Sequence, residues 1–161
     1  MENYTMEGRT YRYYGQDAPL YPFGYGLSYT TFQYRDLVLN PPVLPVCANL
    51  SVSVVLENTG QWDGEEVVQL YLRWEQSSVP VPRWQLVAFQ RVAVPAGRET
   101  KLSFHVGAER RAVWAQDWRL EPGTFTLFAG GQQPGQQRRA PSEVLSAQFT
   151  VTGAARPLRG C

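Results

Sequence analysis

The amino-acid sequence predicts an all-β fold, a β-sandwich of about seven strands preceded by an aromatic-rich segment. Three observations predict it. From residue 32 onward, apolar and polar residues alternate with a period of two, as on half-buried strands. Clusters of Gly, Pro, Asn and Asp interrupt this alternation at short intervals. The only helix-like stretch, residues 107–118, suits a single turn. The 161 residues suffice for one domain with a core.

The seven expected strands are residues 32–39, 49–58, 66–74, 84–94, 99–106, 124–130 and 143–151. The second places Leu50, Val52 and Val54 on one face and serines on the other, as in an antiparallel strand with one solvated face. The third, "EVVQLYLRW", is almost continuously apolar, which is typical of a strand covered on both faces. Short strands spaced by turns indicate an immunoglobulin-like or fibronectin type III-like sandwich over residues 32–153.

Three stretches lie outside the strand pattern. Residues 1–31 do not share the alternation. Residues 130–142, "GGQQPGQQRRAPS", lack core-forming side chains and are expected to be a flexible loop. Residues 154–161 are expected to be a disordered tail. Because Cys161 ends that tail, a disulfide between Cys47 and Cys161 is possible, but two unpaired cysteines are the favoured expectation.

The segment "YPFGYGLSYTTF", residues 21–32, is rich in rings although it is unsuited to regular structure. Pro22 lacks a backbone donor, and Gly24 and Gly26 disfavour helix and strand interiors. Burying a large side chain contributes about 1.5–3 kcal/mol, whereas fixing one residue's backbone costs about 1–2 kcal/mol. The segment can therefore be ordered if a surface receives its rings. Eight rings between Tyr11 and Phe32 exceed what the sandwich can cover, which indicates a second surface outside this chain.

The charge balance excludes several partners. The formal net charge is +1 and the isoelectric point about 7.8, so no overall field favours nucleic acid or an anionic membrane. No apolar run approaches the roughly 20 residues of a membrane helix. The first residues do not resemble a signal peptide, but a fragment would have lost its leader. The acceptor patterns at Asn3 and Asn49 indicate N-glycosylation and therefore a secreted or lysosomal protein.

No catalytic constellation can be assembled from these residues. The candidate carboxylates lie in turns, where solvated side chains are expected: Asp63, Glu65, Glu66, Asp117 and Glu121. The single histidine, His105, alternates with apolar neighbours and is expected to point outward, away from any Cys or acidic cluster. We expect no metal, no cofactor and no catalytic residue in this chain.

Five tryptophans allow two interpretations. Trp62, Trp74, Trp84, Trp114 and Trp118 could form a platform on which sugar rings stack. Packing in the core and at a domain interface is the favoured interpretation, because aromatic side chains provide the largest burial in small domains. A flat, exposed pair of indoles would reverse that preference.

Four ordered blocks resemble a known family. They are "GRTYRYYG…PLYPFGYGLSYTTF", "LENTGQWDGEEVVQLYL", "PVPRWQLVAFQRVAVPAGRETKLSFHV" and "LEPGTFTLFAG". In this order and spacing they resemble the C-terminal part of glycoside hydrolase family three, which includes β-glucosidases and the β-xylosidase/α-arabinofuranosidase branch. The resemblance covers about residues 8–130 and implies a fibronectin type III-like domain. No position matches the family's aspartate nucleophile or its acid/base residue.

The resemblance implies that two upstream domains, a (β/α)8 barrel and an α/β sandwich, are the partners of this chain. Residues 1–31 then correspond to the end of the α/β sandwich domain plus the interdomain linker. The expected interface residues are Arg9, Tyr11, Arg12, Tyr13, Tyr21, Phe23, Tyr25 and Tyr29. The expected function is that of a non-catalytic accessory domain of a β-xylosidase-like glycosidase. A stand-alone polysaccharide-binding module and an extracellular adhesion domain remain alternatives.

Overall fold

The computed structural model describes residues 5–15, 19–135 and 144–161. Its long strands are β1 (Phe32–Asn40), β3 (Leu50–Asn58), β4 (Gly64–Trp74), β5 (Gln85–Val94), β6 (Glu99–Val106), β9 (Gly123–Gly130) and β10 (Leu145–Thr152). Its short elements are α1 (Thr10–Tyr13), β2 (Val43–Pro45), η1 (Ala108–Arg111), β7 (Val113–Trp114), β8 (Trp118–Leu120), β11 (Arg156–Pro157) and η2 (Leu158–Gly160). None of the helices in these ranges has the length and apolar character needed to cross a membrane.

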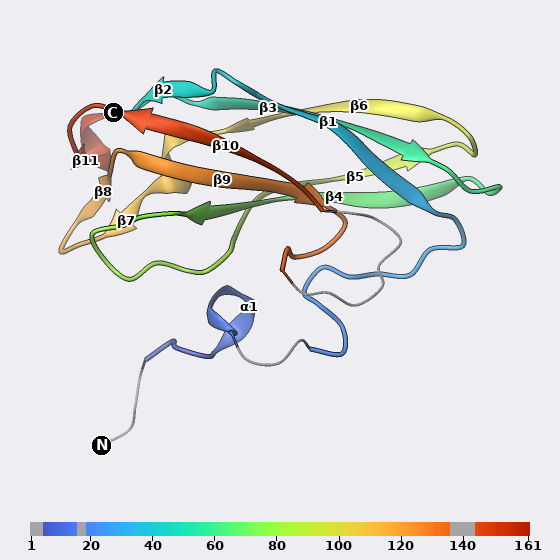
Figure 1. Ribbon diagram of the computed structural model, residues 1–161, viewed down its shortest axis with the longest axis horizontal. Coiled ribbons are helices and arrows are strands. Elements are labelled where there is room, and N and C mark those ends of the chain that lie inside the picture. The colour runs from blue at the N-terminus through green and yellow to red at the C-terminus, as the bar shows by residue number, and fades with distance from the viewer. Residues whose placement is uncertain (1–4, 16–18, 136–143) are drawn as a thin grey trace.

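The long strands form two sheets packed face to face (Figure 1). One sheet has the order β1-β3-β6, and the other has the order β2-β10-β9-β4-β5. The pairs are antiparallel except β2 with β10, which run parallel. A small sheet, β11-β8-β7, lies at one end of the sandwich. The expected β-sandwich is confirmed, and each of the seven expected strands coincides with a long strand to within two residues.

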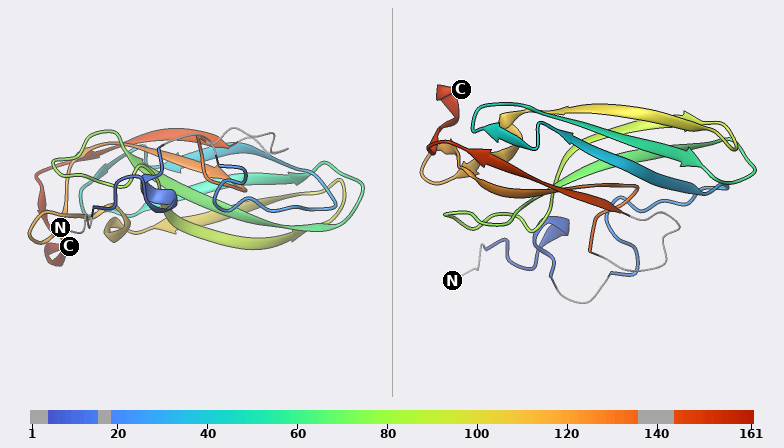
Figure 2. Two further views of the ribbon diagram at one scale, coloured as in Figure 1. Left: turned by 90° about the horizontal axis from the view of Figure 1, so that it is seen from below. Right: turned by 45° about the horizontal axis from the view of Figure 1, so that its top comes forward.

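The core lies between the two sheets. On β3, the alternating residues Leu50, Val52, Val54 and Leu56 are buried, as the period of two indicates. On β4, five consecutive residues, 68–72, are buried, so this strand is covered on both faces, as its apolar run predicts. The inner face of β4 contacts the core, and the N-terminal segment covers its outer face. The right-hand view of Figure 2 shows this segment, with α1, outside the five-stranded sheet.

The C-terminal residues differ from the expected disordered tail. Strand β11 pairs with β8 through Arg156 and Pro157, and η2 follows it. A disulfide joins Cys47 to Cys161, with their Cα atoms 5.4 Å apart. The sequence of the tail shows no periodicity because its strand, β11, has only two residues. The tail is held in place by the disulfide, which joins two positions distant in sequence.

The loop after β9 also differs from expectation where it is described. Gln132, Gln133 and Pro134 are buried, although glutamines are usually solvated. The Gln133 backbone N–H donates to the Phe23 carbonyl at 2.9 Å, and its Nε2 donates to the Tyr11 carbonyl at 3.0 Å. Gln133 therefore supplies hydrogen bonds to the N-terminal residues, which belong to no strand. Residues 136–142 of the expected flexible loop lie outside the described residues.

Candidate functional site: the aromatic segment and its cleft

The aromatic segment, residues 19–31, begins against the outer face of the five-stranded sheet. The Phe23 ring stacks on Tyr11, with centroids 4.1 Å apart, and Tyr11 packs edge-on against Tyr71 at 6.4 Å. Tyr71 is buried on β4, and its hydroxyl donates to Gln69 Oε1 at 2.6 Å. Burial raises the pKa of Tyr71, which keeps this hydroxyl a donor. The sandwich therefore receives the Tyr11 ring itself, and Phe23 stacks on Tyr11 while staying 44% exposed.

Gln69 joins the sheet to the segment. Its Nε2 donates to the Gly24 carbonyl at 3.0 Å and to the Gly131 carbonyl at 2.9 Å. Gly24 has a φ of +81°, and a Cβ at this position would overlap the Gln69 side-chain amide. Only glycine allows both the left-handed backbone and this close approach. The glycine that disfavours regular structure in the sequence is thus the point of contact with the sheet.

Asn58, at the end of β3, fixes the other end of the aromatic segment. It is fully buried, and its Oδ1 accepts from the Thr30 hydroxyl at 2.6 Å. Its Nδ2 donates to the carbonyls of Trp62 and Val94 at 2.8 and 2.9 Å. One amide side chain therefore holds the segment, the turn after β3 and the end of β5 together.

Four large apolar side chains of the aromatic segment face solvent, two of them before the Gly24 attachment and two between Gly24 and Thr30. Leu20, Tyr21, Leu27 and Tyr29 are 62%, 66%, 89% and 99% exposed, and we call them the exposed apolar set. Tyr21 and Tyr25 stack on each other with centroids 5.6 Å apart. The sandwich thus covers some of the rings and leaves others in water, on a segment whose two ends are fixed.

The remaining expected interface residues lie beside this set. Arg9 is exposed, Tyr13 is partly buried, and Arg12 lies over the neighbouring Tyr11 ring at 5.8 Å from its centroid. The Arg12 carbonyl accepts from the Arg83 backbone N–H at 2.8 Å. Their role at an interface stays a prediction.

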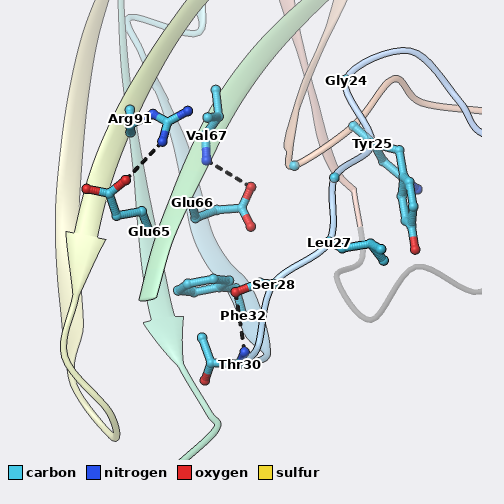
Figure 3. A pocket seen from close by; sticks show the side chains of 13 residues that line it. Gly24, Tyr25, Leu27, Ser28, Thr30, Phe32, Glu65, Glu66, Val67 and Arg91 are labelled. Atoms are coloured by element: carbon cyan, nitrogen blue, oxygen red, sulfur yellow. Dashed lines mark hydrogen bonds and ion pairs between the residues drawn. The ribbon is translucent and has the colours of Figure 1, made fainter. Parts of the chain in front are cut away.

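A cleft of about 290 Å³ separates the aromatic segment from β4 (Figure 3). Its walls are residues 24–28, Thr30 and Phe32 on one side, Glu65, Glu66 and Val67 of β4 on the other, and Gly131 and Gln132 directly after β9. Figure 3 shows the Glu66 side chain extending from β4 toward the aromatic segment, above Ser28 and Phe32. Arg91 also lines the cleft and forms an ion pair with Glu65 at 2.9 Å.

Glu66 is the feature that sequence reasoning missed. The turn-rich sequence around Asp63 indicated solvated carboxylates, but Glu65 and Glu66 lie within β4, and Glu66 is half-buried. Burial raises the pKa of Glu66, although the Val67 N–H, which donates to it at 3.0 Å, and the nearby Tyr34 hydroxyl both act to lower this pKa. The sequence did carry one signal of this burial: Glu66 stands directly before the apolar run of β4, which is covered on both faces.

The other candidate carboxylates have structural partners. Asp63 accepts from the Ala96 N–H, Asp117 pairs with Arg119, and Glu121 accepts from Ser78. His105 is exposed beside Ser51, as expected. Within the described residues, no group of three His, Cys, Asp or Glu side chains could hold a metal ion.

The tryptophans divide between the two interpretations. Trp74 and Trp84 are buried, whereas Trp62, Trp114 and Trp118 are exposed. Trp114 and Trp118 form a cross-strand pair in the β7–β8 hairpin, with an interplanar angle of 68°. This pair is exposed but not flat. Asn49 is exposed and so accessible to glycosylation, whereas Asn3 lies outside the described residues.

The raised pKa of Glu66 predicts a pH-dependent stability. The folded protein holds the Glu66 proton more tightly than the unfolded chain, so this contribution is present in full below the ordinary glutamate pKa and is lost as pH rises through the folded-state pKa. Glu66→Gln should therefore raise the melting temperature near neutral pH and leave it almost unchanged in acid. Melting curves at both pH values measure this effect.

The neighbouring carboxylate supplies the control for that prediction. Glu65→Gln alters an exposed residue paired with Arg91 and should not raise the melting temperature at neutral pH. Equal effects of the two substitutions would contradict the prediction, as would a loss of stability in Glu66→Gln.

The class of this domain follows from its structure and from a family model. The structure has two packed sheets whose pairs are antiparallel except β2 with β10, preceded by an N-terminal segment rich in aromatic residues. Residues 66–133 match the model of the fibronectin type III-like domain, and the chain contains such a domain. The solved structure of a β-glucosidase from Erythrobacter marinus superposes with a TM-score of 0.77 and 30% identity, over 86% of this chain and 18% of that one.

The relatives identify the family in which this domain occurs. A periplasmic β-glucosidase of Salmonella typhimurium is 38% identical over 75% of this chain and 16% of its own length. A β-xylosidase of Formosa agariphila is 35% identical over 80% of this chain and 18% of its own length. The glycoside hydrolase family three β-glucosidase of Bifidobacterium adolescentis superposes with a TM-score of 0.70 and 27% identity, over 81% of this chain and 18% of that chain.

The domain is therefore homologous to a region of glycoside hydrolase family three β-glucosidases and β-xylosidases, which confirms the resemblance seen in the four sequence blocks. The chain spans less than a fifth of the length of each of these relatives. In the relatives, the matched region is one part of a longer glycosidase.

Proposed function

We propose that this chain acts as a non-catalytic accessory domain of a β-glycosidase and packs against catalytic domains through the exposed apolar set. One observation carries the proposal: Leu27 and Tyr29 are almost fully exposed on a segment fixed at Gly24 and at Thr30. Fixing exposed apolar side chains in water gains little, whereas burying each of them against a partner contributes about 1.5–3 kcal/mol.

The names of the relatives support hydrolysis of O-glycosyl bonds as the activity of the whole protein, in the β-glucosidase or β-xylosidase class. The partners would be the (β/α)8 and α/β sandwich domains upstream, which would carry the catalytic carboxylates. The stand-alone polysaccharide-binding alternative has less support, because the exposed pair Trp114 and Trp118 is tilted edge to face and offers no flat platform.

A chimera tests the accessory role. Replacing the matching region of the Salmonella typhimurium β-glucosidase by this chain should preserve hydrolysis of an aryl β-glucoside, whereas this chain alone should give no turnover. In the chimera, Leu27→Ser with Tyr29→Ser should weaken the interface by about 3 kcal/mol or more. The double variant should therefore lose activity at a lower temperature than the unsubstituted chimera.

The hairpin tryptophans provide a matched control for the chimera. Trp114→Ser with Trp118→Ser removes two apolar side chains that are also exposed but lie outside the aromatic segment. The control chimera should inactivate at the same temperature as the unsubstituted one. Equal loss in the two double variants, or turnover by this chain alone, would contradict the proposal.

We also propose a secreted or lysosomal location. The Cys47–Cys161 disulfide supports it, because disulfides persist in oxidising compartments, and the exposed Asn49 acceptor is consistent with it. Thiol labelling of the protein isolated under acid quench should find both cysteines oxidised, and free thiols at both would contradict the location.

A further inference from the structure

The two cysteines of the disulfide lie in different surroundings. Cys47 lies shortly after β2 and is partly buried against the core, whereas Cys161 follows η2 and is exposed. A small thiolate from solvent therefore reaches the Sγ atom of Cys161 more easily than that of Cys47. In thiol–disulfide exchange, a thiolate attacks one sulfur and the other sulfur leaves as a thiolate. Access thus favours attack at Cys161 and release of Cys47.

The backbone on both sides of Cys47 is held by hydrogen bonds that do not involve the disulfide. The Val46 N–H donates to the Thr152 carbonyl at 2.9 Å. The Arg111 Nη2 atom donates to the carbonyls of Val46 and Ala48 at 3.0 and 2.8 Å. Opening of the disulfide therefore leaves Cys47 in its present position.

Two guanidinium groups favour a negative charge at Cys47. The Arg156 Nη1 atom lies 3.8 Å from the Cys47 Sγ atom. Arg111, which binds the carbonyls on both sides of Cys47, is 2% exposed and forms no ion pair among the described residues. A neighbouring cation stabilises a thiolate, and the sulfur that forms the more stable thiolate leaves faster. Charge therefore favours the same direction of exchange as access.

The acidic side chains on the neighbouring elements do not cancel this charge. Each of them already has a partner of its own: Glu109 pairs with Arg110, Asp117 pairs with Arg119, and Glu121 accepts from Ser78. The tail, residues 154–161, contains two arginines and no acidic side chain. The surroundings of Cys47 therefore carry an excess of positive charge.

We propose that Cys161 is a site of reversible S-thiolation by small monothiols. A thiolate RS⁻ forms a bond to Cys161 Sγ, the bond between the two cysteine sulfurs breaks, and Cys47 leaves as a thiolate beside Arg156. One disulfide replaces another, so the step consumes no oxidant or reductant. Attack of the Cys47 thiolate on the modified Cys161 reverses it when the monothiol is removed. The crosslink that holds the tail thus depends on the concentration of thiol.

The position of the added group tests this direction of exchange. The oxidised protein is treated with 2-mercaptoethanol, a neutral monothiol, and quenched early with acid. A maleimide added at low pH then labels free thiols, and peptide mass spectrometry locates both groups. The hydroxyethylthio group should lie on Cys161 and the maleimide on Cys47, about fivefold or more in excess over the reverse arrangement. Equal amounts of the two products would contradict the proposal, as would a disulfide that this thiol does not open.

Arg156→Gln and Arg159→Gln form a matched pair that tests the role of charge. Each removes one exposed positive charge from the tail, but only Arg156 is bonded to Cys47 Sγ in the described structure. Arg156→Gln should slow opening by 2-mercaptoethanol about threefold, because the leaving thiolate loses a stabilising cation. Arg159→Gln should leave the rate almost unchanged, and both oxidised variants should keep the melting temperature of the parent. Equal rates of opening in the two variants would overturn the proposal.

This site goes beyond the accessory role, because it uses neither the exposed apolar set nor the partner domains. The exchange measurements do not bear on the activity of the chimera. Failure of the thiolation site and failure of the accessory role can therefore be distinguished.

Discussion

Asn58→Ala is expected to lower the free energy of unfolding by about 3 kcal/mol and to release the end of the aromatic segment. The substitution removes the acceptor of the Thr30 hydroxyl and the donor to the buried Val94 and Trp62 carbonyls. Each buried group left without a partner costs about 1–3 kcal/mol. This loss is a large part of the roughly 5–15 kcal/mol of a typical domain.

Chemical denaturation measures this effect, and Asn49→Ala provides the control. Asn49 is exposed and accepts one hydrogen bond, from the Ala108 backbone N–H at 3.2 Å, so its replacement should cost less than about 1 kcal/mol. If Asn58→Ala were no more destabilising than Asn49→Ala, Asn58 would not be the residue that fixes the segment to the sandwich.

The strands could be predicted from sequence because each of them carries its own signal. Alternation on β3 and the continuous apolar run of β4 follow from which faces are buried, and burial is local to the strand. The short strands β2, β7, β8 and β11 could not be predicted, since two or three residues cannot show a period. The order of the C-terminal tail depends on Cys47, which lies 114 residues away in sequence.

The site was predictable only in part, for a related reason. The number of rings between Tyr11 and Phe32 indicated more apolar surface than the sandwich covers; Tyr21 and Tyr29 are exposed, and a partner surface that covers them stays a prediction. Which rings stay exposed depends on where Gly24 and Thr30 are attached, and their partners Gln69 and Asn58 lie on other strands. Glu66 resembled a turn residue because the chain that half-buries it arrives from another part of the sequence.

These two attachments bear on both the exposed apolar set and the cleft. They hold Leu27 and Tyr29 exposed, where a partner domain could cover them, although Leu27 also lines the cleft. They also keep the segment apart from Glu66, so that the cleft remains open (Figure 3). If the segment were released, the apolar set and the cleft wall would lose their shape together. Loosening the segment at Gly24 should therefore affect both surfaces.

Gly24→Ala and Gly26→Ala form the matched pair that tests this dependence. Alanine at position 24 must adopt a φ near +81°, which costs about 1–2 kcal/mol, and its methyl group displaces the Gln69 amide from its hydrogen bonds. At position 26, the φ is not in the left-handed region, and a Cβ would meet no atom of the described residues within 4 Å. Gly24→Ala should therefore lower the free energy needed to detach the segment from the sheet by about 3 kcal/mol, and Gly26→Ala should have almost no effect on it.

Amide hydrogen exchange reports this detachment directly. The Gln133 N–H donates to the Phe23 carbonyl and the Arg83 N–H to the Arg12 carbonyl, so both amides are protected only while the N-terminal residues are docked. In Gly24→Ala their exchange should accelerate by about a hundredfold, while amides of β3 and β6 keep their protection because the core between the sheets is untouched. Equal protection of Gln133 in the two variants would show that the sheet does not need this glycine to hold the segment, and the common origin of the two surfaces would then be wrong.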